Sequence, residues 1–127
     1  MKALDTSALI AAEKDPTVRA LLEIEEDLII PAMAAAEFLV GIRLSSKESV
    51  RLRAQDFYDE ALRPAVLPFD EAQAQTLASL LTENRRTGRT MKMFDAAIAA
   101  TAIDLACPLI VRDNDFDGIE GLTVEKI

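Results

Sequence analysis

The stretch DLIIPAMAAAEFLVGIRL, residues 27–44, carries the pattern from which the fold can be predicted. Its first five residues form a compact β-branched run typical of a strand, and Pro31 then opens a helix that is apolar nearly all round. A helix without a polar face is expected to be buried. Glu37 stands in the middle of this helix, where a carboxylate without a partner must neutralise or destabilise the fold. Glu37 is therefore a candidate ligand or catalytic residue.

The same succession of short apolar strand and helix recurs on both sides of this stretch. Further strands are predicted at residues 1–5, 65–69, 108–113 and 122–127, with Pro68 marking the second of these as short or close to a sheet edge. Helices are predicted at residues 8–15, 17–26, 45–62, 70–88 and 95–106. Parallel neighbours need crossover connections, so the sequence indicates an α/β fold. We expect a mostly parallel central sheet of about four to five strands flanked by helices on both faces.

The composition fits a single soluble domain over residues 1–127. Half of the residues are apolar, 28% are charged and 5% are aromatic, and a chain of this size can bury a core without a metal or a disulfide. The single Cys107 cannot form an internal disulfide, and no secretory signal or membrane span is apparent, so we expect a cytoplasmic protein. Histidine is absent, which excludes Ser-His-Asp and Cys-His nucleophiles and His-ligated zinc. Any chemistry must depend on carboxylates.

The charge balance bears on the possible partners. Fourteen basic residues against 22 acidic residues give a formal net charge of −8, which repels a polyanion at long range. A divalent cation held by several carboxylates would reverse that sign locally. The positions of the acidic residues therefore matter more than their number.

Four acidic residues are predicted to meet at one rim of the sheet. Asp5 and Asp113 come at the carboxyl ends of predicted strands, where ligands gather in open α/β sheets. Glu37 and Asp95 belong to helices that follow or feed those strands. Each acid also has a plain structural interpretation, because Asp5 could cap a turn, Asp95 could be a helix N-cap, and Asp113 could belong to a solvated turn with Asp115. Only their conjunction is informative.

Four segments in this order resemble the successive motifs of the PIN-domain ribonucleases: MKALDTSALI, PAMAAAEFLVGI, FDAAIAATA and LIVRDNDFDGIEGLTV. The length and the closing motif look most like the VapC-type toxins of type II toxin-antitoxin pairs. The resemblance implies that Asp5, Glu37, Asp95 and Asp113 are catalytic, and that Asp5, Asp95 and Asp113 bind the metal. Ser7 matches a supporting hydroxyl. The family usually has threonine or serine where this chain has Val111, which leaves Asp115 open as the alternative fourth ligand.

The function implied is a Mg²⁺-dependent endoribonuclease, with Mn²⁺ as a plausible substitute. Mg²⁺ prefers a few carboxylates together with substrate phosphate oxygens, and Glu37 could orient the attacking water. The resemblance also implies a homodimer neutralised by a cognate antitoxin, with no direct sequence-specific DNA binding by this chain. The segment RRTGRTMK could contact RNA phosphates, or it could complement a helix dipole and continue as a solvated loop. Its basic residues are Arg85, Arg86, Arg89 and Lys92.

Three other interpretations remain open at this point. A catalytically silent PIN-like binding module is compatible with Val111. A receiver-type phospho-acceptor domain is also α/β with acidic strand ends, but it needs a lysine where the strand at 108–113 carries Arg112. An aspartyl phosphatase typically needs a second aspartate at the position that Ser7 occupies.

Overall fold

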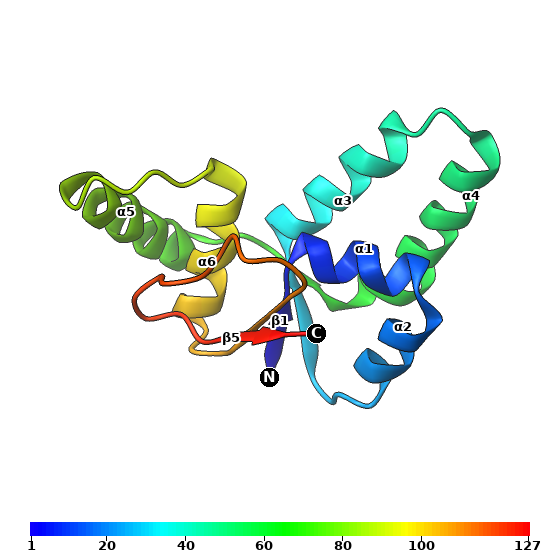
Figure 1. The fold of residues 1–127 in the computed structure, drawn as a ribbon, viewed down its shortest axis with the longest axis horizontal. Coiled ribbons are helices and arrows are strands. Elements are labelled where there is room, and N and C mark those ends of the chain that lie inside the picture. The colour runs from blue at the N-terminus through cyan, green and yellow to red at the C-terminus, as the bar shows by residue number, and fades with distance from the viewer.

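The computed structural model describes all residues from 1 to 127, and its centre is a parallel sheet (Figure 1). The five strands lie in the order β3-β2-β1-β4-β5, and every neighbouring pair is parallel. The strands are β1 (Lys2–Leu4), β2 (Leu28–Pro31), β3 (Val66–Leu67), β4 (Leu109–Val111) and β5 (Val124–Lys126). The predicted α/β class and strand number are confirmed, and β3 is short and lies at an edge, as Pro68 predicts.

Helices cover the sheet from two sides (Figure 1). They are α1 (Thr6–Lys14), α2 (Pro16–Glu23), α3 (Ala32–Leu44), α4 (Glu48–Phe57), α5 (Glu71–Arg86) and α6 (Met93–Asp104). A π-helical turn at Tyr58–Leu62 and a 3₁₀ turn at Arg63–Ala65 connect α4 to β3. The helices α5 and α6 pack together on one side, whereas α1 to α4 lie on the other. None of these helices has the length and apolar character needed to cross a membrane.

The strand order determines where a ligand site can form. From β1 the chain builds outward through β2 and β3, and then returns to place β4 on the other side of β1. The connections that leave β1 and β4 therefore diverge, which opens a crevice beyond their carboxyl ends. Asp5 directly follows β1, and Asp113 follows β4 by two residues.

Aspartate side chains begin three of the helices. Asp5 caps α1 by accepting a hydrogen bond from the Ser7 N–H, Asp15 caps α2 in the same way, and Asp70 caps α5. Each carboxylate satisfies an N–H group that a helix start leaves without an intrahelical partner. Two other helices begin without a side-chain cap. Helix α4 begins at Glu48 after Lys47, and Asp95 lies inside the first turn of α6, whose N-cap is Lys92, so the interpretation of Asp95 as an N-cap is wrong.

The helices α6 and α3 both have apolar sequences, but they differ in how much of their surface is buried. In α6 every residue from Ala96 to Ala102 is buried, and its small side chains allow close packing on the sheet and on α5. Helix α3 is buried on one face only, so the expectation of a fully buried helix is wrong. Val40 and Leu44 are 52% and 79% exposed, because α1, α4 and α6 contact α3 and leave its remaining side open.

A buried polar pair ties α5 to α6. The Thr101 hydroxyl donates a hydrogen bond to Gln73 Oε1 at 2.6 Å, and the Gln73 amide donates to the Pro68 carbonyl. Both side chains are almost fully buried. A buried acceptor without a donor destabilises the fold by its full desolvation free energy. The pair therefore favours the one position of α6 against α5 in which the Thr101 hydroxyl reaches Gln73 Oε1.

We predict that Thr101→Val lowers the free energy of unfolding by about 1–3 kcal/mol, since it leaves Gln73 Oε1 buried without a donor. The matched control is Thr82→Val on the exposed side of α5, which should change stability by less than about 0.5 kcal/mol. Urea unfolding followed by circular dichroism measures both values. Equal effects of the two substitutions would show that the buried pair is energetically unimportant.

Candidate active site

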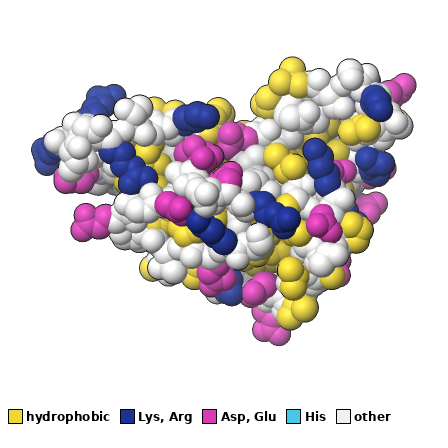
Figure 2. Space-filling model, in the orientation of Figure 1, with side chains coloured by type: hydrophobic (Ala, Val, Ile, Leu, Met, Phe, Trp, Pro, Cys, Tyr) yellow, Lys and Arg dark blue, Asp and Glu magenta, His cyan; other side chains and the backbone are white.

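Acidic side chains gather at the floor of a hollow between the α5–α6 side of the molecule and the α3 side (Figure 2). This hollow lies at the end of the sheet where the connections that follow β1 and β4 diverge. Asp5 is the most buried of its acids, at 3% exposure. Burial raises the pKa of the Asp5 carboxyl, hydrogen bonds from Ser7 and Thr6 oppose that rise, and the charge of Asp113 adds to it.

Ser7 links the ends of the two central strands. Its hydroxyl donates to Asp5 Oδ2 at 2.6 Å and accepts a hydrogen bond from the Arg112 N–H at 2.9 Å. Arg112 is the residue immediately before Asp113. One hydroxyl therefore sets the distance between the carboxylate after β1 and the segment that carries the acids after β4.

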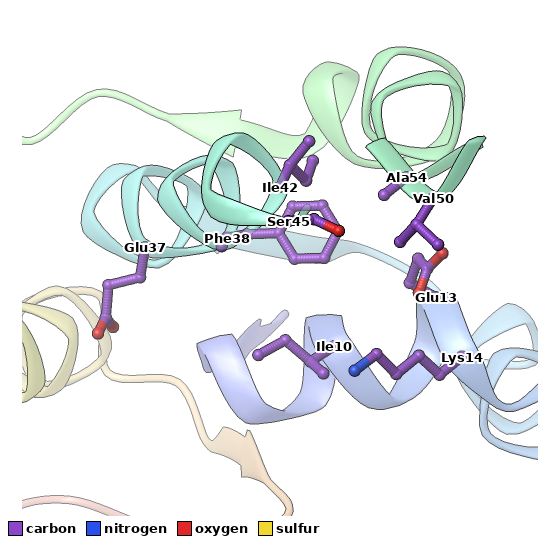
Figure 3. Close-up of a pocket in the computed structure, with 10 residues that line it drawn as sticks. Ile10, Glu13, Lys14, Glu37, Phe38, Ile42, Ser45, Val50 and Ala54 are labelled. Carbon is purple, nitrogen blue, oxygen red and sulfur yellow. The ribbon is translucent and has the colours of Figure 1, made fainter. Parts of the chain in front are cut away.

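Glu37 is half-buried rather than enclosed, and it has a partner. The Thr6 hydroxyl donates to Glu37 Oε1 at 2.7 Å. Figure 3 shows the Glu37 carboxylate extending from α3 away from the apolar side chains of Phe38 and Ile42. The sequence flagged Glu37 as an acid interrupting an apolar helix, and the structure explains it by a polar contact at the rim of the hollow.

Asp95 experiences the charges of the other acids most strongly. Burial raises the pKa of its carboxyl to about 6, and the negative charges of Glu37, Asp115 and Asp5 contribute in that order. Lys92 acts in the opposite direction. The charges of Glu37, Asp115 and Asp5 therefore act on Asp95 in addition to its burial. The convergence of the four acids on one metal-binding rim stays a prediction.

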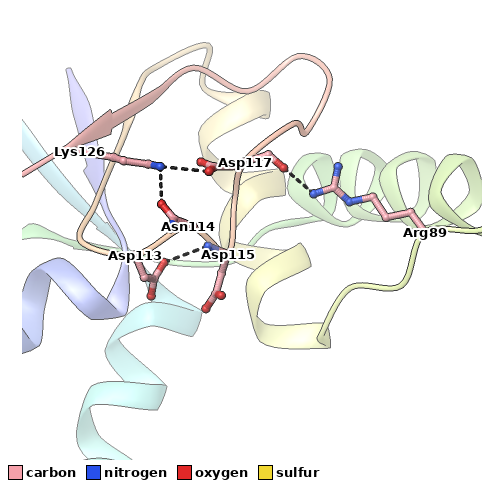
Figure 4. A network of polar contacts seen from close by, with 6 residues as sticks. All are labelled: Arg89, Asp113, Asn114, Asp115, Asp117 and Lys126. Atoms are coloured by element: carbon pink, nitrogen blue, oxygen red, sulfur yellow. Dashed lines mark hydrogen bonds and ion pairs between the residues drawn. The ribbon is translucent and has the colours of Figure 1, made fainter.

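Asp113 and Asp115 stand on one loop but interact with different acids. The charge of Asp113 acts on Asp5, whereas the charge of Asp115 acts on Asp95. The Asp115 N–H donates to Asp113 Oδ1 at 3.3 Å, and both carboxylates lie on the opposite side of the loop from Asp117 (Figure 4). Both residues therefore contribute charge to the hollow, so the geometry keeps both as candidates.

The set of donors suits a hard divalent cation. Carboxylate oxygens are the ligands that Mg²⁺ and Mn²⁺ prefer, and a cation would relieve the repulsion that raises the Asp95 pKa. No three acidic side chains lie close enough as they stand to enclose one ion. Mg²⁺ does not need such an enclosure, because one or two carboxylates usually hold it together with waters and substrate phosphates.

The basic segment after α5 divides into residues with different environments. The Arg89 guanidinium donates to the Asp117 and Gly118 carbonyls at 2.7 and 2.8 Å. Lys92 is exposed and, together with Arg89, lines a pocket of about 190 Å³ that also contains Asp95 and Asp115. Arg85 and Arg86 are exposed in the last turn of α5. Lys92 is thus the cation of this segment that lies next to the acids without a carbonyl to bind.

Three residues of the site escaped prediction from the sequence. The sequence does not single out Thr6, although its hydroxyl donates a hydrogen bond to Glu37. Asn114 and Lys126 had no signal, yet the Lys126 ammonium bonds both Asn114 and Asp117 (Figure 4). The available signal was the run of polar residues between two predicted strands, which brings any cation of the last strand close to the loop.

Comparison with known proteins gives consistent matches over nearly the whole chain. The family model of the PIN domain matches residues 2–122. Ribonuclease VapC5 of Mycobacterium tuberculosis is 29% identical over 124 residues, covering 98% of this chain and 91% of that protein. VapC ribonuclease Y4jK of Sinorhizobium fredii is 29% identical over 133 residues, covering 98% and 95%.

Solved structures show the same fold. The crystal structure of VapBC2 from Rickettsia felis bound to a DNA fragment from its promoter has a TM-score of 0.87 at 21% identity, covering 99% of this chain and 98% of that chain. The structure of VapBC-5 from M. tuberculosis has a TM-score of 0.76 at 27% identity, covering 99% and 96%.

We predict that Asp95→Asn stabilises the metal-free protein at pH 7. The folded-state pKa of about 6 lies above the ordinary value of 3.8, so ionisation of Asp95 penalises the folded state as the pH rises from 4 to 6 and fully above it. Because the side chain is largely solvated and its ionised form also favours a helix N-terminus, we expect a gain of about 1 kcal/mol.

Urea unfolding in EDTA at pH 7 and pH 4 measures this gain, which should approach zero at the lower pH. Asp56→Asn on the exposed side of α4 is the control and should change little at either pH. A pH-independent effect of Asp95→Asn would show that carboxylate repulsion is not its cause.

Proposed function

The chain belongs to the PIN domain family, and from that premise we propose that it is an endoribonuclease toxin that hydrolyses RNA phosphodiester bonds using Mg²⁺ or Mn²⁺ and is neutralised by a cognate antitoxin. The observation that carries this proposal is that the charge of Asp113 acts on Asp5, and the charges of Glu37, Asp115 and Asp5 act on Asp95, beyond the carboxyl ends of β1 and β4. The relatives that match almost the whole chain are named as VapC ribonucleases, which supports the same substrate class.

Each acid has a role that follows from its surroundings. Asp5, Asp95 and Asp113 would hold the ion, with Asp115 as the alternative ligand because its charge reaches Asp95. When bound, the ion would polarise a phosphodiester and make a water molecule more acidic. Glu37 would orient the attacking water and accept its proton, since Thr6 leaves one of its carboxylate oxygens without a protein donor.

Ser7 has a positioning role in this scheme. Its hydroxyl donates to Asp5 Oδ2 and thereby leaves Oδ1 available to a cation. The Ser7 N–H bonds the same oxygen. These two donors also favour the ionised form of a nearly buried carboxyl, which is the form that a metal ion binds.

The RNA backbone needs cations next to an acidic hollow. Lys92 borders the pocket that contains Asp95 and Asp115, and Arg85 and Arg86 extend the basic surface along the end of α5. We assign phosphate contacts to these residues first, because their side chains are exposed. Arg89 is treated separately below, since its guanidinium is already engaged.

An apolar groove supports the antitoxin as a partner. A pocket of about 190 Å³ lies between α1, α3 and α4 and is lined by Ile10, Phe38, Ile42, Val50 and Ala54 (Figure 3). The exposed Leu44 and Leu52 belong to the same helices. Such a groove suits the apolar face of a partner helix. We propose the antitoxin as its occupant, with a homodimer formed through another face, and no direct recognition of DNA sequence by this chain.

The alternative functions receive less support. A receiver domain of the doubly wound type has the strand order 2-1-3-4-5, whereas this sheet has the order β3-β2-β1-β4-β5. One observation supports a catalytically silent binding module. The fully buried Val111 occupies the position where the family usually carries a hydroxyl. That module would bind RNA or a partner without cutting, so the activity test below separates it.

We predict that the purified chain cuts unstructured RNA with Mg²⁺ or Mn²⁺ but not with EDTA. Asp5→Asn and Glu37→Gln should each lower kcat at least about a hundredfold, because they remove a ligand and the general base. The control, Asp56→Asn, keeps the acidic hollow and should match the wild type. Cutting that persists in EDTA or in Asp5→Asn would refute the proposal, and no cutting with any metal would favour the silent module.

We predict that Lys92→Gln raises KM for RNA several-fold and leaves kcat nearly unchanged. Removing one phosphate contact should also reduce the slope of log(1/KM) against log[KCl] by about 0.7, the value for single-stranded nucleic acid. Steady-state assays at several KCl concentrations measure both effects. The control is Arg43→Gln, an exposed cation near the end of α3. An unchanged salt slope in Lys92→Gln would exclude a phosphate contact at this residue.

A further inference from the structure

The loop that carries Asp113 and Asp115 is held from both of its sides. Residues 112–121 connect β4 to β5. On the inner side, Phe116 and Ile119 are buried in the hydrophobic core at 1% and 6% exposure. On the outer side, polar contacts come from two cations outside the loop, Arg89 and Lys126 (Figure 4).

Arg89 binds the backbone of this loop rather than a side chain. One guanidinium nitrogen donates to the Asp117 carbonyl and another donates to the Gly118 carbonyl. These are successive carbonyl groups, and the planar fork of a guanidinium can bond both at once. A lysine ammonium lacks this planar fork, so it would not match both carbonyls in the same geometry. Gly118 has φ +75°, a conformation that side-chain-bearing residues rarely adopt, so the carbonyls meet the fork only where the loop turns on a glycine.

Arg89 is itself held rigidly by the end of α5. Gly88 has φ +75°, the Gly88 N–H donates to the Arg85 carbonyl, and the Arg89 N–H donates to the Asn84 carbonyl at 2.8 Å. These two bonds form a Schellman motif, in which a left-handed glycine ends the helix and fixes the residue after it. The backbone of Arg89 is therefore already ordered by the end of α5, so binding of the loop by its side chain costs no further backbone entropy.

Lys126 holds the other arm of the loop. Its ammonium bonds the Asn114 side chain and Asp117 Oδ2, the latter at 3.0 Å. Asn114 lies between Asp113 and Asp115 in the sequence. The two cations thus act on the segment 114–118, while the carboxylates of Asp113 and Asp115 lie on the opposite side of the loop (Figure 4).

We propose that Arg89, assisted by Lys126, is a positioning residue that fixes the loop 112–121 so that Asp113 and Asp115 face the acidic hollow, and that it is not an RNA-contact residue. This deepens the proposed function and rests on it, because the benefit is a preformed set of carboxylates for a divalent cation. Without these contacts from Arg89 and Lys126, which we call the clamp, the Asp117 and Gly118 carbonyls and the Asn114 side chain lose their cationic donors, and the segment that carries Asp113 and Asp115 is free to shift. The clamp uses its two positive charges on acceptors of the protein itself, the Asp117 and Gly118 carbonyls and the Asn114 and Asp117 side chains.

The test compares Arg89→Gln and Arg89→Lys with the matched control Arg43→Gln. Amide hydrogen exchange is measured at Asp115, Asp117 and Leu122, whose N–H groups donate hydrogen bonds within or next to the loop. Mn²⁺ affinity is measured by titration calorimetry without RNA. The kcat and KM values for RNA cleavage, with the salt slope, form the third measurement. Thermal unfolding confirms that each variant is folded.

In Arg89→Gln we expect exchange of these amides to accelerate about tenfold, and Mn²⁺ affinity to fall several-fold, from the loss of charge-assisted hydrogen bonds. The kcat for RNA should fall, while KM and its salt slope stay within about twofold of wild type, since no phosphate contact is lost. Arg89→Lys should recover part of each effect, because one carbonyl regains a donor. Arg43→Gln should match wild type.

The possible negative results distinguish an error in the role of Arg89 from an error in the proposed ribonuclease function. A rise in KM with a smaller salt slope, at unchanged exchange and Mn²⁺ affinity, would make Arg89 an RNA contact and overturn the clamp. Accelerated exchange with unchanged Mn²⁺ affinity would also overturn it, because the loop would then not serve the acids. If the wild type fails to cut RNA while exchange and Mn²⁺ affinity respond as expected, the ribonuclease assignment fails and the clamp stands. A wild-type chain that binds no Mn²⁺ would overturn both.

Discussion

The repulsion among carboxylates at one end of the sheet is the constraint on which the rest of the site depends. Asp5, Glu37, Asp95 and the acids of the loop 112–121 come from four separate segments, and the charges of the others raise the pKa values of Asp5 and Asp95 in addition to burial. A fold in which β1 and β4 are neighbours cannot avoid this meeting if both strands end in acids. The site exists because hydrogen bonds and packing hold these groups against a force that separates them.

The compensating contacts are local and specific. Thr6 and Ser7, adjacent in the first turn of α1, donate to Glu37 and Asp5 respectively, so one helix start orients two of the acids. Ser7 also accepts a hydrogen bond from the Arg112 N–H and thereby ties the loop 112–121 to the segment that carries Asp5. The position two residues before Asp113, where a hydroxyl is usual in the family, is filled by Val111, which packs in the core. In this chain the hydroxyl that joins the strand ends comes from β1's side of the crevice.

The sequence predicts those parts of the molecule that depend on local chemistry. The cap role of Asp5 and the short edge strand marked by Pro68 can each be predicted from neighbouring residues, and the structure agrees with both. Glu37 could be singled out because an acid within an apolar helix is itself an anomaly. The exposed side of α3 could not be predicted, because it depends on which helices pack against α3 and which side they leave open.

The loop acids mark the limit of prediction from sequence for a different reason. Asp113, Asp115 and Asp117 alternate along one segment and are chemically identical, so local pattern cannot rank them. Their environments differ through residues distant in the chain: Asp5 lies near Asp113, Asp95 near Asp115, and Lys126 binds Asp117. The same holds for Arg89, which belongs to a basic run whose composition suggests a phosphate-binding surface. Its guanidinium meets the Asp117 and Gly118 carbonyls only once the chain has folded. In an acidic protein, a cation next to the active site can thus act on the protein's own backbone, and only the long-range contacts distinguish that role from substrate binding.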